Sequence, residues 1–256
     1  MRAPMGVQTR VAARDRSVSR REGVFAMPDR RTFILALSML LVGCVSQGGD
    51  DGGTGPSRQT APAAGTSPGP PRPNAHDALI DAVERRRSVR AFTGEPVRDE
   101  DVALMLWAAQ GVTDARRGLR AAPSAGALYP LEVYVASAEG LSRYIPGRDE
   151  MRRTSGDDVR QALALAALGQ SFIAQAPVVF VITGVYSRTA GKYGTRAERY
   201  VHLEAGHAAQ NILLVATRLG LGGTPVGAFS DDAVRGVLGA DDGETPLYVM
   251  PVGHPA

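Results

Sequence analysis

The sequence lacks several features that would assign the chain to a class at once. It contains a single cysteine, Cys44, so no internal disulfide framework is possible. It contains a single lysine, Lys192, although lysine and arginine together number 29. It shows neither an internal repeat of roughly 20 to 50 residues nor a heptad array, which excludes solenoid proteins and long coiled coils. The chain must therefore be interpreted from its composition, its hydrophobic periodicity and its short motifs.

The apolar run from Phe33 to Val42 is short. It has about ten residues, whereas a helix that crosses a bilayer needs roughly 20. Such a length is typical of the apolar region of a signal peptide. The preceding Arg30-Arg31 pair resembles a twin-arginine export signal, and Leu41-Val42-Gly43-Cys44 resembles a bacterial lipobox. The alternative is a buried helix with an incidental cysteine. We expect an exported protein, lipid-anchored to the bacterial cell envelope through Cys44.

Charge and composition divide the chain into parts. Residues 1–31 hold eight arginines and three acidic residues, so the rest of the chain has a small negative net charge. A basic face is therefore not expected on the folded part, and nucleic acid is not expected as a partner. Gly, Pro, Ser, Thr and Ala dominate residues 46–73, a composition that buries too little apolar surface to fold. We expect a leader with its signal peptide over residues 1–43, with Met27 as an alternative start, a flexible tether over 44–74 and a folded domain over 75–256.

The folded part mixes helical and strand patterns. Apolar residues at helical spacing predict helices over residues 76–87, 99–110, 157–168 and 196–219. Short apolar or alternating runs predict strands over residues 131–136, 177–183 and 247–252. Because helices and strands are mixed and the strands are few, the predicted fold class is α+β.

Two segments carry residues suited to ligand binding. Four arginines lie within residues 85–90. Guanidinium groups bind phosphate oxygens in pairs, but cations at the end of a helix also stabilise its dipole, and the composition favours neither interpretation. Small residues fill the stretch between Pro123 and Pro130. They either let a planar ligand approach the backbone or form an ordinary turn.

Two further segments argue against common sites. The glycine-rich stretch Gly220–Phe229 lacks the G-x-G-x-x-G spacing and follows a helix, so it is not a Rossmann fingerprint. His202 and His207 are five residues apart, which places them about 140° apart around a helix. A zinc pair of the metalloprotease kind needs two histidines four residues apart on one face. We therefore expect no metal site.

The order of these segments resembles the FMN-dependent nitroreductase superfamily. The closest resemblance is to its SagB-type branch, the dehydrogenases that oxidise thiazoline and oxazoline rings in peptides. The matching stretches are RRSVRAF from Arg86, PSAGALYPLEVYV from Pro123, KYGTRAERYVHLEAGHAAQNILL from Lys192, LGLGGTPVGAF from Leu219 and PLYVMPVGHP from Pro246. The resemblance implies a central, mostly antiparallel sheet flanked by helices.

The resemblance also implies site residues and partners. The cofactor is FMN, and the residues implied to bind it are Arg86, Arg87, Ser88, Arg90, Pro123, Ser124, Gly126, Ala127, Pro225, Val226, Gly227 and Ala228. The long helix with Gln210 and Asn211 would form the core of a homodimer. Many relatives have a basic pair after the final strand, where this chain has only His254.

Lys192 and Tyr193 are the implied catalytic residues. A lysine in a chain that otherwise uses arginine is a candidate for proton transfer, although a surface lysine kept by chance is an equal alternative. In the azoline dehydrogenases a Lys-Tyr pair at the matching place takes part in proton removal. We expect an oxidoreductase that moves hydride between an electron donor and a small organic substrate by a ping-pong mechanism. The alternatives are an azoline dehydrogenase and a lipid-anchored flavin-binding protein without turnover.

Overall fold

The computed structural model describes residues 24–26 and 77–256. The expected leader and tether, with Cys44, lie outside these residues. The helices are α2 (Ala78–Arg85), α3 (Asp99–Gln110), α4 (Arg160–Ala166), α5 (Phe172–Gln175), α6 (Tyr186–Tyr193), α7 (Ala197–Arg218) and α8 (Asp231–Leu238), with the 3-10 turns η2 (Ala125–Ala127) and η3 (Gly194–Arg196). The strands are β1 (Val24–Ala26), β2 (Val112–Asp114), β3 (Leu119–Arg120), β4 (Leu131–Ser137), β5 (Gly140–Ile145), β6 (Glu150–Ser155), β7 (Val178–Gly184), β8 (Gly222–Gly223) and β9 (Thr245–Gly253).

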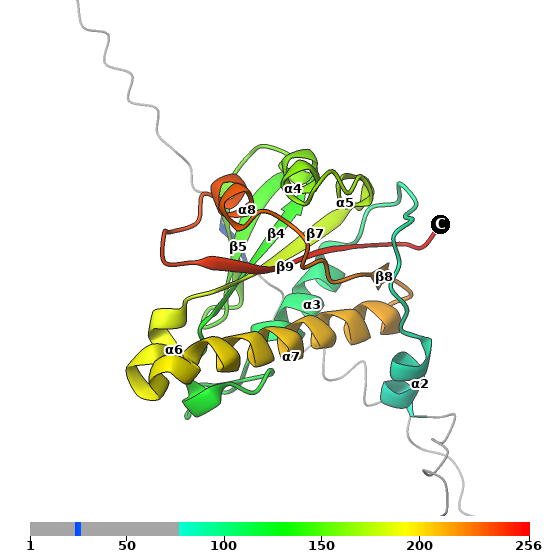
Figure 1. The fold of residues 1–256 in the computed structure, drawn as a ribbon. Helices are drawn as coiled ribbons and strands as arrows, with labels where there is room; N and C mark the ends of the chain where they lie inside the picture. The colour runs from blue at the N-terminus through cyan, green and yellow to red at the C-terminus, as the bar shows by residue number, and fades with distance from the viewer. Residues whose placement is uncertain (1–23, 27–76) are drawn as a thin grey trace, which may run out of the picture.

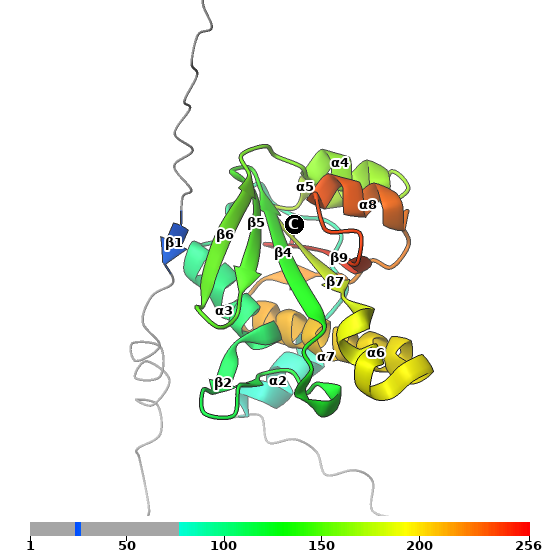
Figure 2. The ribbon, with the colours of Figure 1, turned by 90° about the vertical axis from the view of Figure 1, so that its left-hand side faces the viewer.

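One antiparallel sheet organises the described residues. Its strand order is β1-β6-β5-β4-β7-β9-β8, and β2 and β3 form a separate hairpin. Every residue of β7 is buried, as its unbroken apolar and β-branched sequence requires. The predicted α+β class is confirmed, as is the antiparallel sheet flanked by helices (Figures 1 and 2).

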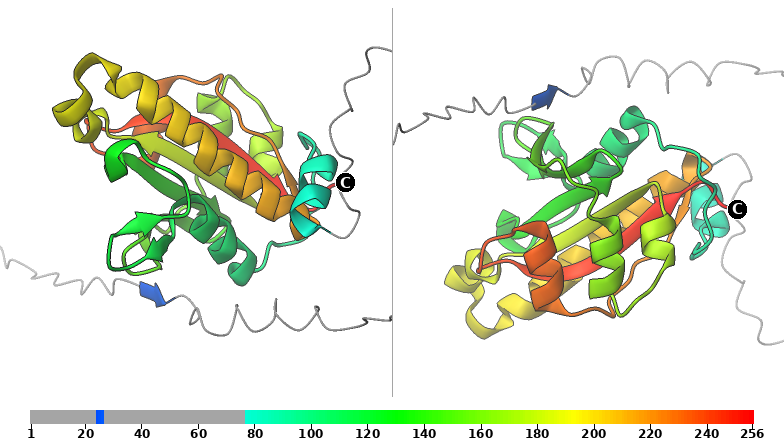
Figure 3. Two further views of the ribbon diagram at one scale, coloured as in Figure 1. Left: turned by 90° about the horizontal axis from the view of Figure 1, so that it is seen from below. Right: turned by 90° about the horizontal axis from the view of Figure 1, so that it is seen from above.

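Helices cover both faces of the sheet. The long helix α7 and α3 pack on one face, and α4, α5 and α8 cover the other, as the views from below and above show (Figure 3). Each face has its own hydrophobic core: Phe180 and Ile182 belong to the cluster that includes α3 and α7, and Val179 and Val181 to the other. This alternation follows from the period of two along a strand.

Several predicted elements needed correction. The helix predicted over residues 157–168 is the shorter α4, because Leu168 and Gly169 adopt positive φ angles of 60° and 75°, which no helix continues through. A second short helix, α5, follows it. The hairpin β5–β6 and the helices α6 and α8 were not predicted, so the expectation of few strands was wrong. Within the described residues no helix is long and apolar enough to traverse a bilayer.

Candidate functional site

The arginine segment is held between two backbones. After α2 the chain runs extended, and the Val89 N–H donates to the Gly223 carbonyl at 3.1 Å. On the other side the Thr93 N–H donates to the His254 carbonyl at 2.9 Å. The segment from Arg86 to Arg90 therefore lies beside β8 and the end of the chain, and His254 is near it as the sequence predicted.

Close packing requires the glycines of β8. A Cβ at Gly222 would lie 2.4 Å from Val89 Cγ2, and one at Gly223 would lie 2.7 Å from the Pro251 carbonyl oxygen. Both distances are shorter than any real contact, so no side chain fits here. The glycines of β8 thus serve the approach of one protein backbone to another.

The arginines of this segment lack acidic partners. In the range 77–256, Arg86, Arg87 and Arg90 form no ion pair with a carboxylate. Arg87 turns back and donates to the Glu84 carbonyl at 2.6 Å, at the end of α2. The Arg90 guanidinium lies 5.9 Å from the centroid of the Phe172 ring. Arg86 and Arg90 are therefore the cations most available for an anion, while Arg87 already stabilises the end of a helix.

The segment after β8 offers free backbone donors. Val226 is buried and exchanges two hydrogen bonds with Val249, at 2.9 and 3.0 Å. Pro225, Gly227 and Ala228 are exposed. Within the described part of the chain the N–H groups of Gly227 and Ala228 have no hydrogen-bond partner, and no atom lies within 4 Å of the place where a Cβ on Gly227 would be. A flat ring has room to lie against this backbone.

The loop from Pro123 to Tyr129 is strained. Gly126, Ala127 and Tyr129 have φ angles of 63°, 55° and 47°. Two of these residues are not glycine, and such strain concentrates at functional sites. The Ser124 hydroxyl accepts a hydrogen bond from the Tyr129 N–H at 2.9 Å and fixes the loop from within.

Lys192 and Tyr193 lie against this loop. A Cβ on Gly126 would be 2.9 Å from both Lys192 Nζ and Tyr193 Oη, so the two polar groups converge on one backbone position. The Tyr193 ring also meets Tyr200 edge to face, with centroids 4.9 Å apart. The structure thus brings the predicted catalytic pair together with the predicted flavin-facing loop.

The arginine segment and the predicted catalytic pair lie toward opposite ends of α7. The arginine segment and β8 adjoin the C-terminal end of α7, whereas α6 and η3, with Lys192 and Tyr193, lead into its N-terminal end (Figure 1). At 1.5 Å per residue, the 22 residues of α7 span about 33 Å. This arrangement favours a site in which the second group, with Lys192 and Tyr193, comes from another copy of the chain.

Of the two residues predicted on the dimer face of α7, only one points outward. Gln210 is exposed on it, and no atom lies within 4 Å of a Cβ placed on Gly206, so a second helix has room to approach. Leu203 is also exposed there. Asn211 points inward instead, where its amide donates to the Ala108 carbonyl of α3 at 2.9 Å. Asn211 therefore ties α7 to α3 within the protomer.

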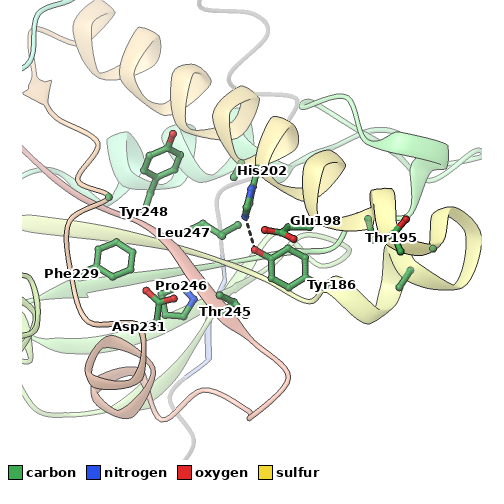
Figure 4. Close-up of a pocket in the computed structure, with 15 residues that line it drawn as sticks. Tyr186, Thr195, Glu198, His202, Phe229, Asp231, Thr245, Pro246, Leu247 and Tyr248 are labelled. Atoms are coloured by element: carbon green, nitrogen blue, oxygen red, sulfur yellow. Dashed lines mark hydrogen bonds between the residues drawn. The ribbon is translucent and has the colours of Figure 1, made fainter.

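A cavity of about 750 Å³ opens between α6, α7, α8 and the start of β9 (Figure 4). Gly227 lies at its wall, together with the ring of Phe229 and that of Tyr248. The Tyr186 hydroxyl and His202 Nε2 share a hydrogen bond of 2.6 Å across it. The sequence did not reveal Tyr186 or this role of His202, because the two residues are far apart in the chain and no local spacing connects them.

Glu204 is a buried carboxyl behind the strained loop. It lies on α7, is almost wholly buried, and within the described residues its Oε1 has no hydrogen-bond partner. Burial raises the pKa of Glu204 to about 7, against smaller lowering effects from the Ser124 hydroxyl, the Arg120 guanidinium and the Gln110 amide. The carboxyl that faces Ser124 is thus largely protonated in mildly acidic solution.

Glu204 should make the protein less stable as the pH rises. Between its ordinary pKa of 4.5 and the folded value of about 7, the unfolded chain loses the proton while the folded chain keeps it. The free energy of unfolding therefore falls over this range, by about 3 kcal/mol, and is flat above it. Glu204→Gln should remove this fall, as measured by urea unfolding at pH 5 and pH 8. An unchanged pH slope would contradict the assignment, and the exposed Glu100→Gln serves as the control.

Comparisons with known proteins agree with this architecture. The family model "Nitroreductase family" matches residues 83–254. A nitroreductase-named protein of Methanocaldococcus jannaschii is 48% identical over 182 residues, which cover 69% of this chain and 90% of that protein. The NADPH-flavin oxidoreductase of Vibrio harveyi is 27% identical over 184 residues, 69% of this chain and 65% of that protein. A crystal structure of a Ralstonia eutropha protein described as a nitroreductase has a TM-score of 0.65 and 27% identity, covering 73% of this chain and 88% of that one.

The cofactor that follows from these relatives is FMN. The residues present fit it. Among residues 77–256 no carboxylate pairs with Arg86 or Arg90, which suits them to a phosphate, and the N–H groups of Gly227 and Ala228 have no partner there and suit the polar edge of a flat ring.

Proposed function

This chain belongs to the nitroreductase family, and on that premise we propose that it is an FMN-dependent oxidoreductase in which a donor and an acceptor use one cavity in turn. The observation that carries the proposal is the position of Gly227. Its exposed backbone N–H has no hydrogen-bond partner in the described part of the chain and forms part of the wall of the cavity beside α7. A substrate in that cavity would lie next to a ring held by this backbone.

In this proposal the residues of the chain bind FMN and orient it. Arg86, Ser88 and Arg90 would hold the phosphate, and the N–H groups of Gly227 and Ala228 would fix the ring. Bound FMN supplies the redox chemistry, because its ring accepts and returns two electrons. The Pro123–Ala127 loop of a second copy would close the site, since within one protomer it lies toward the other end of α7. The proposed active unit is therefore a homodimer.

Steady-state kinetics test the ping-pong order. With the FMN-loaded protein, NADPH as donor and a nitroaromatic acceptor, double-reciprocal plots at several acceptor concentrations should be parallel. Stopped-flow mixing should reduce the bound flavin much faster than free FMN. Intersecting lines would contradict the ping-pong order. Reduction no faster than that of free FMN would favour a flavin-binding protein without turnover.

A second candidate function is the oxidation of azoline rings, and the contact of Lys192 and Tyr193 with Gly126 favours it. In that reaction the Lys192 amine would take a proton from a ring carbon of the substrate. Lys192→Ala should then lower turnover of a thiazoline peptide by about 100-fold or more, a typical contribution of a general base. Reduction of a nitroaromatic, which needs no C–H proton removal, should change little. Full thiazoline oxidation by a Lys192→Ala variant with normal flavin content would exclude Lys192 as the base, and a wild-type protein that leaves the thiazoline peptide unchanged would exclude this function.

We also propose that the protein is exported and anchored through a lipid on Cys44. The lipobox-like motif and the short apolar run before it support this placement. A donor other than NADPH, such as a membrane quinol, suits a site outside the cytoplasm. Labelling with a radioactive fatty acid should mark the wild-type protein and not a Cys44→Ser variant. An unlabelled wild-type protein in the cytoplasmic fraction would contradict the anchor.

A further inference from the structure

The wall of the cavity beside Gly227 is acidic. Glu198 from the first turn of α7 and Asp231 from the first turn of α8 both line it (Figure 4). Their charges act on the same space, because burial and, to a smaller extent, both carboxylates raise the pKa of Tyr186, which also lines the cavity. Neither Glu198 nor Asp231 forms an ion pair within residues 77–256. Within these residues no ion pair compensates their negative charge.

The same wall has no arginine or lysine among the described residues. This is notable in a chain with 29 such residues, and it contrasts with the arginine segment at the far end of α7. The remaining polar groups at the wall include the Tyr186–His202 pair, with aromatic faces from Phe229 and Tyr248. The molecule thus separates a phosphate-binding end, rich in cations, from a cavity that is aromatic and negatively charged.

From this separation we propose that the cavity selects its substrate by charge: it takes planar molecules that are neutral or cationic, and it disfavours those with a carboxylate or phosphate beside the reacting ring. The inference rests on the proposed function, since it concerns the substrate of the same cavity. Two carboxylates in a partly enclosed space favour a cation over an anion of the same shape by Coulomb's law. They also leave the anion without a partner when it loses water.

Three nitroaromatic probes of similar size measure this selection: 4-nitrobenzylamine, which is a cation at neutral pH, 4-nitrobenzyl alcohol and 4-nitrobenzoate. Binding to the oxidised, FMN-loaded protein is read from the change in flavin absorbance, and turnover is read separately as kcat/KM. We expect the cation to bind about 100-fold more tightly than the anion at low salt, about tenfold for each carboxylate. The ratio should fall in 0.5 M salt, because exposed charges are screened.

Matched variants test whether the acidic residues of the cavity wall cause this charge selection. Asp231→Asn and Glu198→Gln should each lower the cation-to-anion ratio about tenfold, and the double variant should bring it close to one. The control is Asp232→Asn, because Asp232 also lies in the first turn of α8 but pairs with Arg235 and does not line the cavity. The Asp232 carboxylate stabilises the N-terminus of α8 as the Asp231 carboxylate does, so this control separates that general effect from charge selection in the cavity.

The outcomes separate this inference from the function on which it rests. If the three probes bind and react equally in the wild type, or if Asp232→Asn changes the ratio as much as Asp231→Asn does, charge selection by the wall is wrong while the oxidoreductase stands. If no probe binds or reacts with a flavin-loaded protein, the proposed function itself fails.

Discussion

Replacing Arg86 and Arg90 together by alanine is expected to weaken FMN binding by at least about 100-fold. Each guanidinium would give a charge-assisted hydrogen bond to the phosphate, worth about 1.5 to 3 kcal/mol, and a factor of ten in affinity corresponds to about 1.4 kcal/mol. The fold should not suffer, because neither arginine forms an ion pair within the described residues. Titration of the apoprotein with FMN, followed by the quenching of flavin fluorescence, measures the change.

The matched control for this variant is Arg85→Ala. Arg85 precedes the segment directly but forms an ion pair with Asp81 on α2, so its loss should leave FMN binding almost unchanged. Arg87→Ala should have an intermediate effect, because Arg87 already binds the carbonyls at the end of α2. An Arg86→Ala/Arg90→Ala protein with wild-type affinity for FMN would show that the phosphate binds elsewhere.

If the proposed homodimer forms through α7, a charge on the outer face of this helix is expected to split it and release the cofactor. Leu203 is 50% exposed, and Leu79 of the adjacent helix α2 is 59% exposed, although both are large and apolar. Burial of such a side chain contributes about 1.5 to 3 kcal/mol, and a buried unpaired carboxylate costs more than that contribution. Leu203→Glu should therefore weaken dimerisation by about 100-fold or more. Light scattering after gel filtration, with flavin content measured on the same peak, records both effects.

Leu165→Glu is the control for this second variant. Leu165 is 66% exposed, more than Leu203, but it lies on α4 across the sheet from α7. The Leu165→Glu substitution should leave the molecular mass in solution and the flavin content unchanged. A monomeric Leu203→Glu protein that keeps one FMN per chain at wild-type affinity would refute the shared site, because a single protomer would then hold the cofactor alone.

Elements with a clear apolar pattern could be predicted from the sequence. The helix over residues 99–110 matches α3, and the long helix agrees with α7 within one residue at each end. The strand β7 was evident because all its residues are apolar or small and are buried on both faces. The hairpin β5–β6 was not predicted, because β6 is mostly polar with no buried residue, and its strand character comes from pairing with β5.

The helix α8 had signals that were overlooked. Ser230 caps its first turn by accepting from the Ala233 N–H, and Gly239 ends it in a left-handed conformation. The helix is only eight residues long and follows a glycine-rich stretch, so its apolar pattern is too short to predict a helix rather than another type of element. Short helices of this kind are stabilised by packing rather than by local propensity.

The candidate site divides in the same way. The arginine segment and the two loops could be singled out as candidates, since their residues are close together in the chain and resemble a known family; their contacts with FMN stay predictions. The Tyr186–His202 pair, the acidic wall and the buried Glu204 could not, because each depends on contacts between distant segments. The sequence also could not show that the predicted residues lie toward opposite ends of α7, because this depends on how distant segments pack against the helix.

The most direct test of the shared site is a hybrid dimer of two defective chains, one with Arg86→Ala/Arg90→Ala and the other with Gly126→Val. Valine at Gly126 meets both a φ of 63° and the Lys192 and Tyr193 side chains, so this variant alone should also bind little flavin. In the hybrid, isolated through two different affinity tags, one site combines both defects and the other has neither. The account predicts that the hybrid regains FMN at half the wild-type content. A hybrid as free of flavin as its two parents would contradict it.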